Sequence, residues 1–169
     1  GRVIKRGIPP VALGKLLSGR SSFLREYING MNEIARRPAE EIASLIDLSH
    51  VSEMLDVGGG PGTYSIAFLL NNPDPSSRAT ILDLSTTLKV TSRIVAMHAL
   101  RDRVSLKAGN YHTSDFGRKL YDLILLSHVT HDEGPEDNLR LIRKSFSALR
   151  QGGQVVIHDF MLNNKKTEP

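Results

Sequence analysis

Four glycines lie within five residues, directly after an apolar run that ends in an aspartate. The stretch "MLDVGGGPGTYSI" covers residues 54–66, and Asp56 to Gly62 follows the pattern D-x-G-x-G-x-G. Glycines at Gly58, Gly60 and Gly62 allow a tight turn from strand to helix and a close approach of the backbone to a ligand. Because helix-terminal N–H groups then face that ligand, the stretch predicts a binding loop.

A second acid follows at the distance that a nucleoside-binding fold requires. Asp83 stands in "ATILDLS", roughly 20 residues beyond the glycines, where an acid at the end of the next strand holds ribose hydroxyls. A dinucleotide fingerprint needs a third glycine where this chain has Thr63 or Ser65. Asp56 would repel a pyrophosphate but attract an amino group, which favours S-adenosylmethionine over NAD. A glycine turn that serves only packing is the remaining alternative.

The elements that would position these residues alternate between strand and helix. Residues 22–48 show helical spacing and predict two helices, the second beginning at Pro38. We expect strands at 54–57, 79–84, 104–108, 121–127 and 154–161, and helices at 63–70, 86–99 and 135–149. Strands that are apolar on both faces predict a parallel sheet covered by helices, an α/β fold that binds its ligand at the carboxyl ends of the strands.

Length and composition indicate one globular domain. With 169 residues and 40% hydrophobic composition, we interpret residues 21–169 as a single domain and residues 1–20 as a linker or mobile arm. No stretch has the apolar length of a membrane span, and the chain has no cysteine, so we expect a cytoplasmic protein. The net charge is +4, and the basic excess lies in the first 37 residues. Its loose spacing favours a solvated helix face or linker over a nucleic-acid site.

Several motifs resemble, in order, those of S-adenosylmethionine-dependent O-methyltransferases of the plant caffeate and animal hydroxyindole type. They are "LDVGGGPG", "LDLS", "GNYH" at 109–112 and "YDLILLSHVTHDEGPEDNLRLIRKSFSALRQGGQVVIHDF", preceded by "YINGM" at 27–31. The resemblance covers about residues 26–162. It implies a Rossmann-like class I methyltransferase core, S-adenosylmethionine as cofactor and a small hydroxylated, aromatic acceptor.

The resemblance assigns cofactor and substrate residues. The cofactor set is Asp56, Gly58, Gly60, Gly62, Asp83, Asn110, Tyr111 and Ser127. Asn110 stands where the family usually has an acid near the adenine, but an amide can still donate and accept hydrogen bonds. Tyr111 would lie near the adenine ring or, alternatively, be an ordinary packed aromatic residue, and at Ser127 the family usually has a different residue. Tyr27 and Met31 would line the acceptor pocket.

The resemblance also supplies a catalytic base. Methyl transfer to a hydroxyl is a displacement at a sulfonium carbon, and a phenolate attacks better than a phenol, so a proton must leave the acceptor. His131 matches the family's catalytic histidine, and Asp159 matches an acid that orients it. Asp159 as a simple turn-capping acid is the alternative. His128 beside His131 lacks a carboxylate-rich set, and we expect no metal.

The chain also departs from the family. Glu133 stands where the family usually has tryptophan, and both an N-terminal dimerisation domain and closing C-terminal strands are missing, so the chain resembles a piece of a larger enzyme. A homodimer is expected for the full-length parent. O-methylation is the leading hypothesis. The alternatives are C- or N-methylation of a small metabolite, or a non-catalytic cofactor-binding module.

Overall fold

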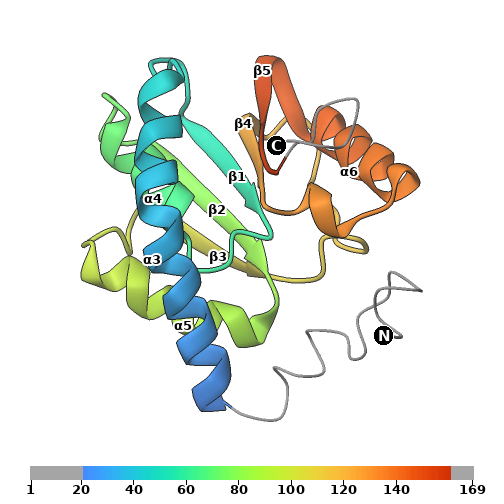
Figure 1. Cartoon of the computed structure of the whole chain (residues 1–169). Helices are drawn as coiled ribbons and strands as arrows, with labels where there is room; N and C mark the ends of the chain where they lie inside the picture. Colours follow the sequence, from blue (N-terminus) through green and yellow to red (C-terminus); the bar gives the residue numbers. More distant parts are fainter. Residues whose placement is uncertain (1–20, 161–169) are drawn as a thin grey trace.

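The computed structural model describes residues 21–160, which form a parallel β-sheet with helices on both faces (Figure 1). The strands are β1 (Glu53–Val57), β2 (Arg78–Asp83), β3 (Val104–Ala108), β4 (Tyr121–Ser127) and β5 (Leu149–His158). The helices are α3 (Ser21–Leu45), α4 (Thr63–Asn71), α5 (Ser85–Met97), the short 3-10 helix η1 (Thr130–Asp132) and α6 (Pro135–Ala148). The expected linker at 1–20 and the last residues, 161–169, lie outside this range.

The sheet has the order β3-β2-β1-β4-β5, and all neighbouring strands are parallel. The chain adds β2 and β3 on one side of β1 and then returns to add β4 and β5 on the other. The strand order therefore reverses between β1 and β4, whose carboxyl ends flank the position where open α/β sheets bind ligands. The predicted α/β fold class is confirmed.

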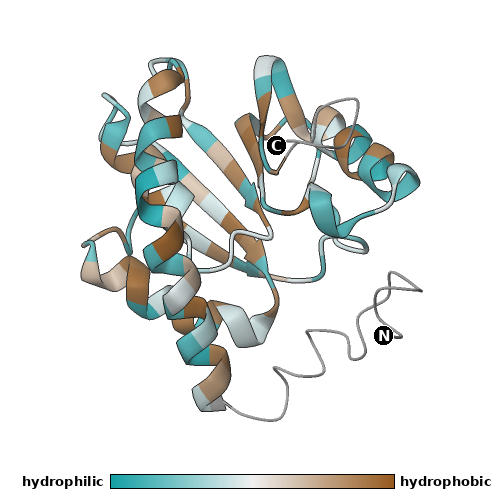
Figure 2. Ribbon diagram, in the orientation of Figure 1, coloured by the Kyte–Doolittle hydropathy of each residue, from teal (hydrophilic) through white to brown (hydrophobic). Residues whose placement is uncertain are grey.

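Alternate strand residues pack into two hydrophobic layers. On one face of the sheet, Met54 and Leu125 pack into a core shared with α3, α4 and α5. On the opposite face, Leu55 and Leu126 pack into a second core with Leu141 of α6. Figure 2 shows hydrophobic residues along the strands and a mixture of hydrophobic and hydrophilic residues along α3. Burial on both faces explains why the central strands β1 and β4 are largely apolar runs in the sequence, whereas β3, at the edge of the sheet, is partly exposed.

The prediction of two N-terminal helices was wrong, because α3 runs through Pro38 without interruption. Three alanines at a spacing of four, Ala35, Ala39 and Ala43, are buried and hold both halves of the helix against the core. Proline removes one backbone hydrogen bond, to the carbonyl of Ile34, and this residue is 73% exposed, so water can satisfy the carbonyl. Although α3 has 25 residues, neither it nor another helix of the described range is apolar enough to cross a membrane.

The last strand also differs from its expected bounds of 154–161, because β5 begins at Leu149 and ends at His158. Leu149 pairs with Tyr121 directly after α6, and Gln154 pairs with Leu123, so the register shifts between the two pairs. Gly152, with φ of +82°, lies in this irregular stretch. The glycine pair at 152–153 thus lies in a bulge inside the strand.

Candidate active site

The loop that joins β1 to α4 depends on backbone conformations that favour glycine. Gly58, Gly60 and Gly62 have φ values of +67°, +53° and +81°, in the left-handed region where a side chain is unfavourable. A Cβ on Gly60 would meet no side chain within 4 Å, whereas one on Gly62 would lie 2.8 Å from Cδ1 of Ile81. Gly60 therefore faces open space, and Gly62 packs against the sheet.

Asp56, in β1, lies beneath this loop and is 1% exposed. Its carboxylate accepts a hydrogen bond from Oγ of Ser65 at 2.7 Å, and a Cβ on Gly59 would lie 2.6 Å from its Cγ. Burial raises the pKa of Asp56 to about 6, against the lowering effect of Ser65 and with added repulsion from Asp83. Near neutral pH the carboxyl group of Asp56 is therefore mostly ionised, and it would stabilise a cationic group of a ligand.

Asp83, the last residue of β2, holds the glycine loop in place. Its Oδ2 accepts a hydrogen bond from the backbone N–H of Gly60 at 2.8 Å, and its Oδ1 accepts one from Leu84 at 2.6 Å. Burial raises the pKa of this carboxyl, while the two backbone N–H groups act in the opposite direction. Each oxygen retains a further lone pair, so Asp83 can bind ligand hydroxyls in addition to the loop.

The segment after β3 forms one wall of the site. Oδ1 of Asn110 accepts a hydrogen bond from the backbone N–H of His112 at 2.8 Å, so its amide nitrogen stays available to a ligand. The hydroxyl of Tyr111 donates to Oε1 of Glu133 at 2.8 Å, and burial raises the pKa of this phenol. Nζ of Lys144 donates to the backbone oxygen of Tyr111 at 2.5 Å. The wall is thus tied to the loop after β4 and to α6.

These residues line a pocket of about 340 Å³ at the carboxyl ends of the central strands. Nine of the predicted site residues line it: Tyr27, Met31, Asp56, Gly58, Gly60, Asp83, Asn110, Tyr111 and Ser127. Within the described residues, Oγ of Ser127 is a buried polar atom without a hydrogen-bond partner, so a bound ligand can supply one. Gly62, His131 and Asp159 are not among the lining residues, but Asp132 is. A second hollow, of about 660 Å³ beside α3 and α4, contains none of the predicted site residues.

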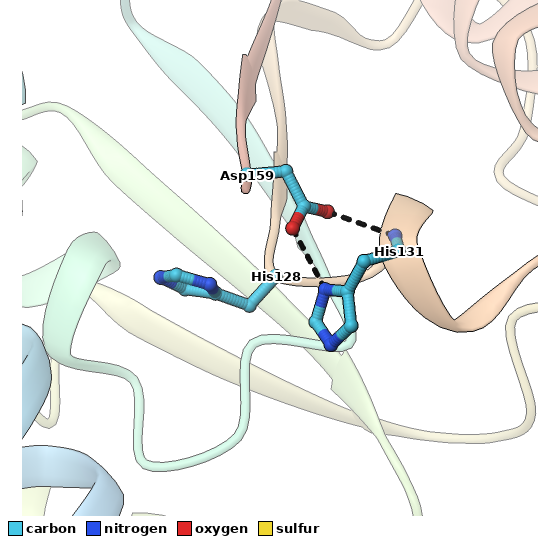
Figure 3. A group of neighbouring side chains, drawn as sticks. All are labelled: His128, His131 and Asp159. Carbon is cyan, nitrogen blue, oxygen red and sulfur yellow. Dashed lines mark hydrogen bonds and ion pairs between the residues drawn. The ribbon is translucent and has the colours of Figure 1, made fainter. Parts of the chain in front are cut away.

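His131 and Asp159 form a hydrogen-bonded pair beyond the ends of β4 and β5 (Figure 3). Nδ1 of His131 lies 2.7 Å from Oδ1 of Asp159, whose side chain is 1% exposed. The other oxygen, Oδ2, accepts hydrogen bonds from the backbone N–H and the hydroxyl of Thr130 and from the backbone N–H of His131. Burial alone would raise the pKa of Asp159, but hydrogen bonds from Thr130, Phe160 and His131 outweigh it and lower the pKa to about 2. Asp159 therefore remains a carboxylate that orients the imidazole ring.

A group of side chains that the sequence did not indicate lies beside this pair. The hydroxyl of Tyr64 is 2.7 Å from Nδ1 of His158 and 3.2 Å from Nε2 of His128. Burial lowers the pKa of His128, so its ring is neutral near pH 7. His128 and Tyr64 line the pocket, and the ring centroids of His128 and His131 are 6.2 Å apart.

The expectation that the site holds no metal stays a prediction. His128, His131 and Asp159 each offer a ligand atom, and these atoms lie within 4.8 Å of one another. The geometry favours hydrogen bonding, however, because both oxygens of Asp159 already accept hydrogen bonds. In Figure 3 His128 makes no interaction with the other two residues; its Nε2 contacts Tyr64 instead.

The comparisons with known proteins point to one family. The model of the O-methyltransferase domain matches residues 13–169. The L-tyrosine C(3)-methyltransferase of Streptomyces lavendulae is 34% identical over 144 residues, which are 85% of this chain and 38% of that protein.

Two solved structures extend this similarity to the fold. An O-methyltransferase family 2 protein from Planctomyces limnophilus, solved with apigenin, has a TM-score of 0.79 at 31% identity and covers 89% of this chain and 46% of its own. The S-adenosylmethionine-dependent methyltransferase SibL, solved in its apo form, has a TM-score of 0.73 at 29% identity, with 85% of this chain and 41% of its own covered. The chain thus spans less than half the length of the proteins it matches.

Proposed function

The chain belongs to the O-methyltransferase domain family, whose members use S-adenosylmethionine, and from this premise we propose that it transfers a methyl group to a hydroxyl of a small aromatic acceptor. The fold expected from the resemblance is confirmed, and the enzymatic nature of the family supports the activity that we propose for this chain. The acceptor, the catalytic residues, the homodimer and the cytoplasmic location remain proposals.

The glycine loop and its two acids fit the cofactor. Asp56 would face the ammonium group of S-adenosylmethionine, and Asp83 would accept hydrogen bonds from the ribose hydroxyls. Asn110 and Tyr111 would contact the adenine, while the unpaired hydroxyl of Ser127 lies among the same lining residues. When bound there, S-adenosylmethionine supplies an electrophilic methyl group on a sulfonium centre.

His131 would act as the general base. The acceptor oxygen bonds to the methyl carbon as the carbon–sulfur bond breaks, and the acceptor proton passes to Nε2 of His131. This assignment needs a proton on Nδ1 and a free lone pair on Nε2, which is the tautomer that a carboxylate at Nδ1 favours. The 2.7 Å contact between Nδ1 and Asp159 is the observation that carries the proposal.

The aromatic nature of the acceptor is supported by the relatives and by α3. One relative is named for L-tyrosine, and a solved neighbour was crystallised with apigenin; both compounds carry phenol groups. Tyr27, Ile28 and Met31 of α3 line the pocket with apolar and aromatic surface that suits a flat ring.

Transfer to a ring carbon is the second candidate. The relative from Streptomyces lavendulae is named a C(3)-methyltransferase, so the family fold serves both outcomes. The same base would serve, because deprotonation of a phenol also activates the ring carbon next to the oxygen. No residue of the described site favours N-methylation or a non-catalytic cofactor module.

The first test separates cofactor binding from catalysis. We expect calorimetry to detect S-adenosylmethionine and S-adenosylhomocysteine binding to this chain. Binding to Asp83→Ala should be at least about tenfold weaker, since the variant loses the hydrogen bond to Gly60 of the glycine loop and the carboxylate proposed for the ribose hydroxyls. The second step measures methyl transfer to a panel of phenols, and mass spectrometry and NMR locate the new methyl group. Full turnover by His131→Ala would refute the base, and ring methylation would select the second candidate.

A further inference from the structure

The charge of the pocket is opposite to that of the chain. The chain has a net charge of +4, yet the described residues that line the pocket include three carboxylates, Asp56, Asp83 and Asp132, and no lysine or arginine. His128 also lines the pocket, but burial lowers the pKa of its ring, so it adds no positive charge near pH 7. The surface that the described residues present to a ligand is therefore anionic.

The cofactor cannot cancel this charge by itself. S-adenosylmethionine carries an ammonium, a carboxylate and a sulfonium group, which leave one net positive charge for three lining carboxylates. Asp56 and Asp83 belong to the end of the pocket formed by the glycine loop. Asp132 lies at the other end, where its Oδ1 is 3.5 Å from Nε2 of His131. An acceptor placed for attack would thus lie beside an uncompensated carboxylate.

Lys144 of α6 contacts the wall of the pocket, and Arg140 lies one turn earlier in the same helix, but both are engaged elsewhere. Nζ of Lys144 donates to the backbone oxygen of Tyr111 and lies 4.2 Å from the ring centroid of Phe116. Arg140 pairs with Asp137. Neither is a lining residue, so neither offers a partner to an anionic group of the acceptor.

We propose, resting on the methyl transfer proposed above, that the pocket selects acceptors without negative charge, namely neutral or cationic phenols. A carboxylate on the acceptor would be repelled by Asp132 and by the other lining carboxylates. Because the side chain of Asp132 is 71% exposed, this repulsion is strongest at low ionic strength. The acceptors that relatives are named for differ in charge, because L-tyrosine carries charges of both signs and 3-hydroxy-5-methyl-1-naphthoate carries a carboxylate. The selection is a feature of this chain's lining residues.

Three phenols of similar length test the proposal: 2-(4-hydroxyphenyl)ethylamine, 2-(4-hydroxyphenyl)ethanol and 3-(4-hydroxyphenyl)propionate. We expect kcat/KM at low salt to be at least about tenfold higher for the amine and the alcohol than for the propionate, a ratio that corresponds to about 1.4 kcal/mol. Equal or faster turnover of the propionate would overturn the proposal. If none of the phenols is methylated, the proposed function fails, while calorimetry of the same compounds on the S-adenosylhomocysteine complex still ranks them by charge.

A pair of variants assigns the effect to Asp132. In Asp132→Asn we expect the preference for the alcohol over the propionate to fall about threefold or more, because one nearby repulsive charge is removed. Glu136→Gln removes an exposed charge from the first turn of α6 outside the pocket and should leave the preference unchanged. Both acceptors are measured with the same variant, so an effect of the substitution on the base His131 changes both rates equally and cancels in their ratio. An unchanged preference in Asp132→Asn would contradict the assignment.

Discussion

Oδ1 of Asp159 lies 2.7 Å from Nδ1 of His131, and the two residues are 28 positions apart in the chain. Two adjacent parallel strands create this contact. Ser127 of β4 pairs with His158 of β5, so the segments that follow the two strands start side by side at the carboxyl end of the sheet. Asp159 also binds the backbone of Thr130 and His131. One buried carboxylate therefore fixes both the loop and the ring that it carries.

Asp159→Asn should lower kcat strongly without a matching loss of cofactor affinity. The amide removes the negative charge that stabilises a protonated imidazole and can present an N–H to Nδ1, which favours the wrong tautomer. We expect kcat to fall by about 10²-fold or more, and calorimetry should show S-adenosylmethionine binding within about threefold of wild type because Asp159 does not line the pocket.

The pH profile gives a control for this interpretation. The pKa of Asp159 is lowered to about 2, so its carboxylate stays ionised through the usual assay range and cannot produce an acid limb above about pH 4. A decrease of kcat toward acid pH should thus persist in Asp159→Asn, with kcat lower at every pH. If that variant instead keeps wild-type kcat, Asp159 serves only as a turn cap.

Asp56 should lower the stability of the free protein while it supports binding. Burial raises its folded-state pKa to about 6, above the usual value for the unfolded chain. The sign follows from linkage: stability is highest below about pH 4 and decreases as pH rises through about 6, where the buried group must ionise. Asp56→Asn should therefore be more stable than wild type at pH 7 by up to about 3 kcal/mol, and equal near pH 4.

Cofactor affinity should change in the opposite direction. If ionised Asp56 holds the ammonium group, S-adenosylmethionine binding to wild type tightens by up to about tenfold between pH 5 and 7. Asp56→Asn should bind more weakly at pH 7 and lose this pH dependence. Denaturant unfolding and calorimetry on the same samples measure both effects, and a variant that is less stable at pH 7 would contradict the role of burial.

The sequence predicted the sheet better than the side-chain constellations. Each predicted strand before β5 exists within one residue of its expected bounds. The pattern is clearest for β1 and β4, whose apolar residues are buried on both faces of the sheet. Pro38 misled the prediction, since local helix rules do not include three buried alanines that hold α3 against the core. Interior packing overrode the local signal.

The contacts of Tyr64 could not be predicted from spacing. Its hydroxyl meets His128 and His158, which lie 64 and 94 positions away in the chain, and only the pairing of β4 with β5 brings the two histidines together. A signal did exist: both histidines follow apolar strand residues at the carboxyl edge, where a parallel sheet gathers its polar side chains. The resemblance, in contrast, indicated His131 and Asp159 without any knowledge of their separation.

Two glycine substitutions should have opposite effects. A Cβ on Gly59 would lie 2.6 Å from Cγ of Asp56 and 2.9 Å from Cγ2 of Ile81, so Gly59→Ala should destabilise the fold by about 1–3 kcal/mol and weaken cofactor binding. Gly30, inside α3, has nothing within 4 Å of a Cβ, so Gly30→Ala should stabilise the protein by roughly 0.5–1 kcal/mol. Denaturant unfolding measures both, and a stabilised Gly59→Ala would show that the loop relaxes.

Two variants of Tyr111 test whether its ring stacks on the adenine of the cofactor or only packs within the protein. Its hydroxyl satisfies Glu133, whose side chain is 10% exposed, and its ring lies against the glycine loop, 3.6 Å from the position of a Cβ on Gly58. Tyr111→Phe should cost about 1–3 kcal/mol of stability, because it removes a hydrogen bond to a largely buried carboxylate, but it should retain S-adenosylmethionine affinity within about threefold. Tyr111→Ala should lower that affinity by about tenfold or more if the ring stacks on adenine. Calorimetry on both variants decides between the roles: equal affinities in the two variants would make Tyr111 a packed aromatic residue that ties the wall to Glu133.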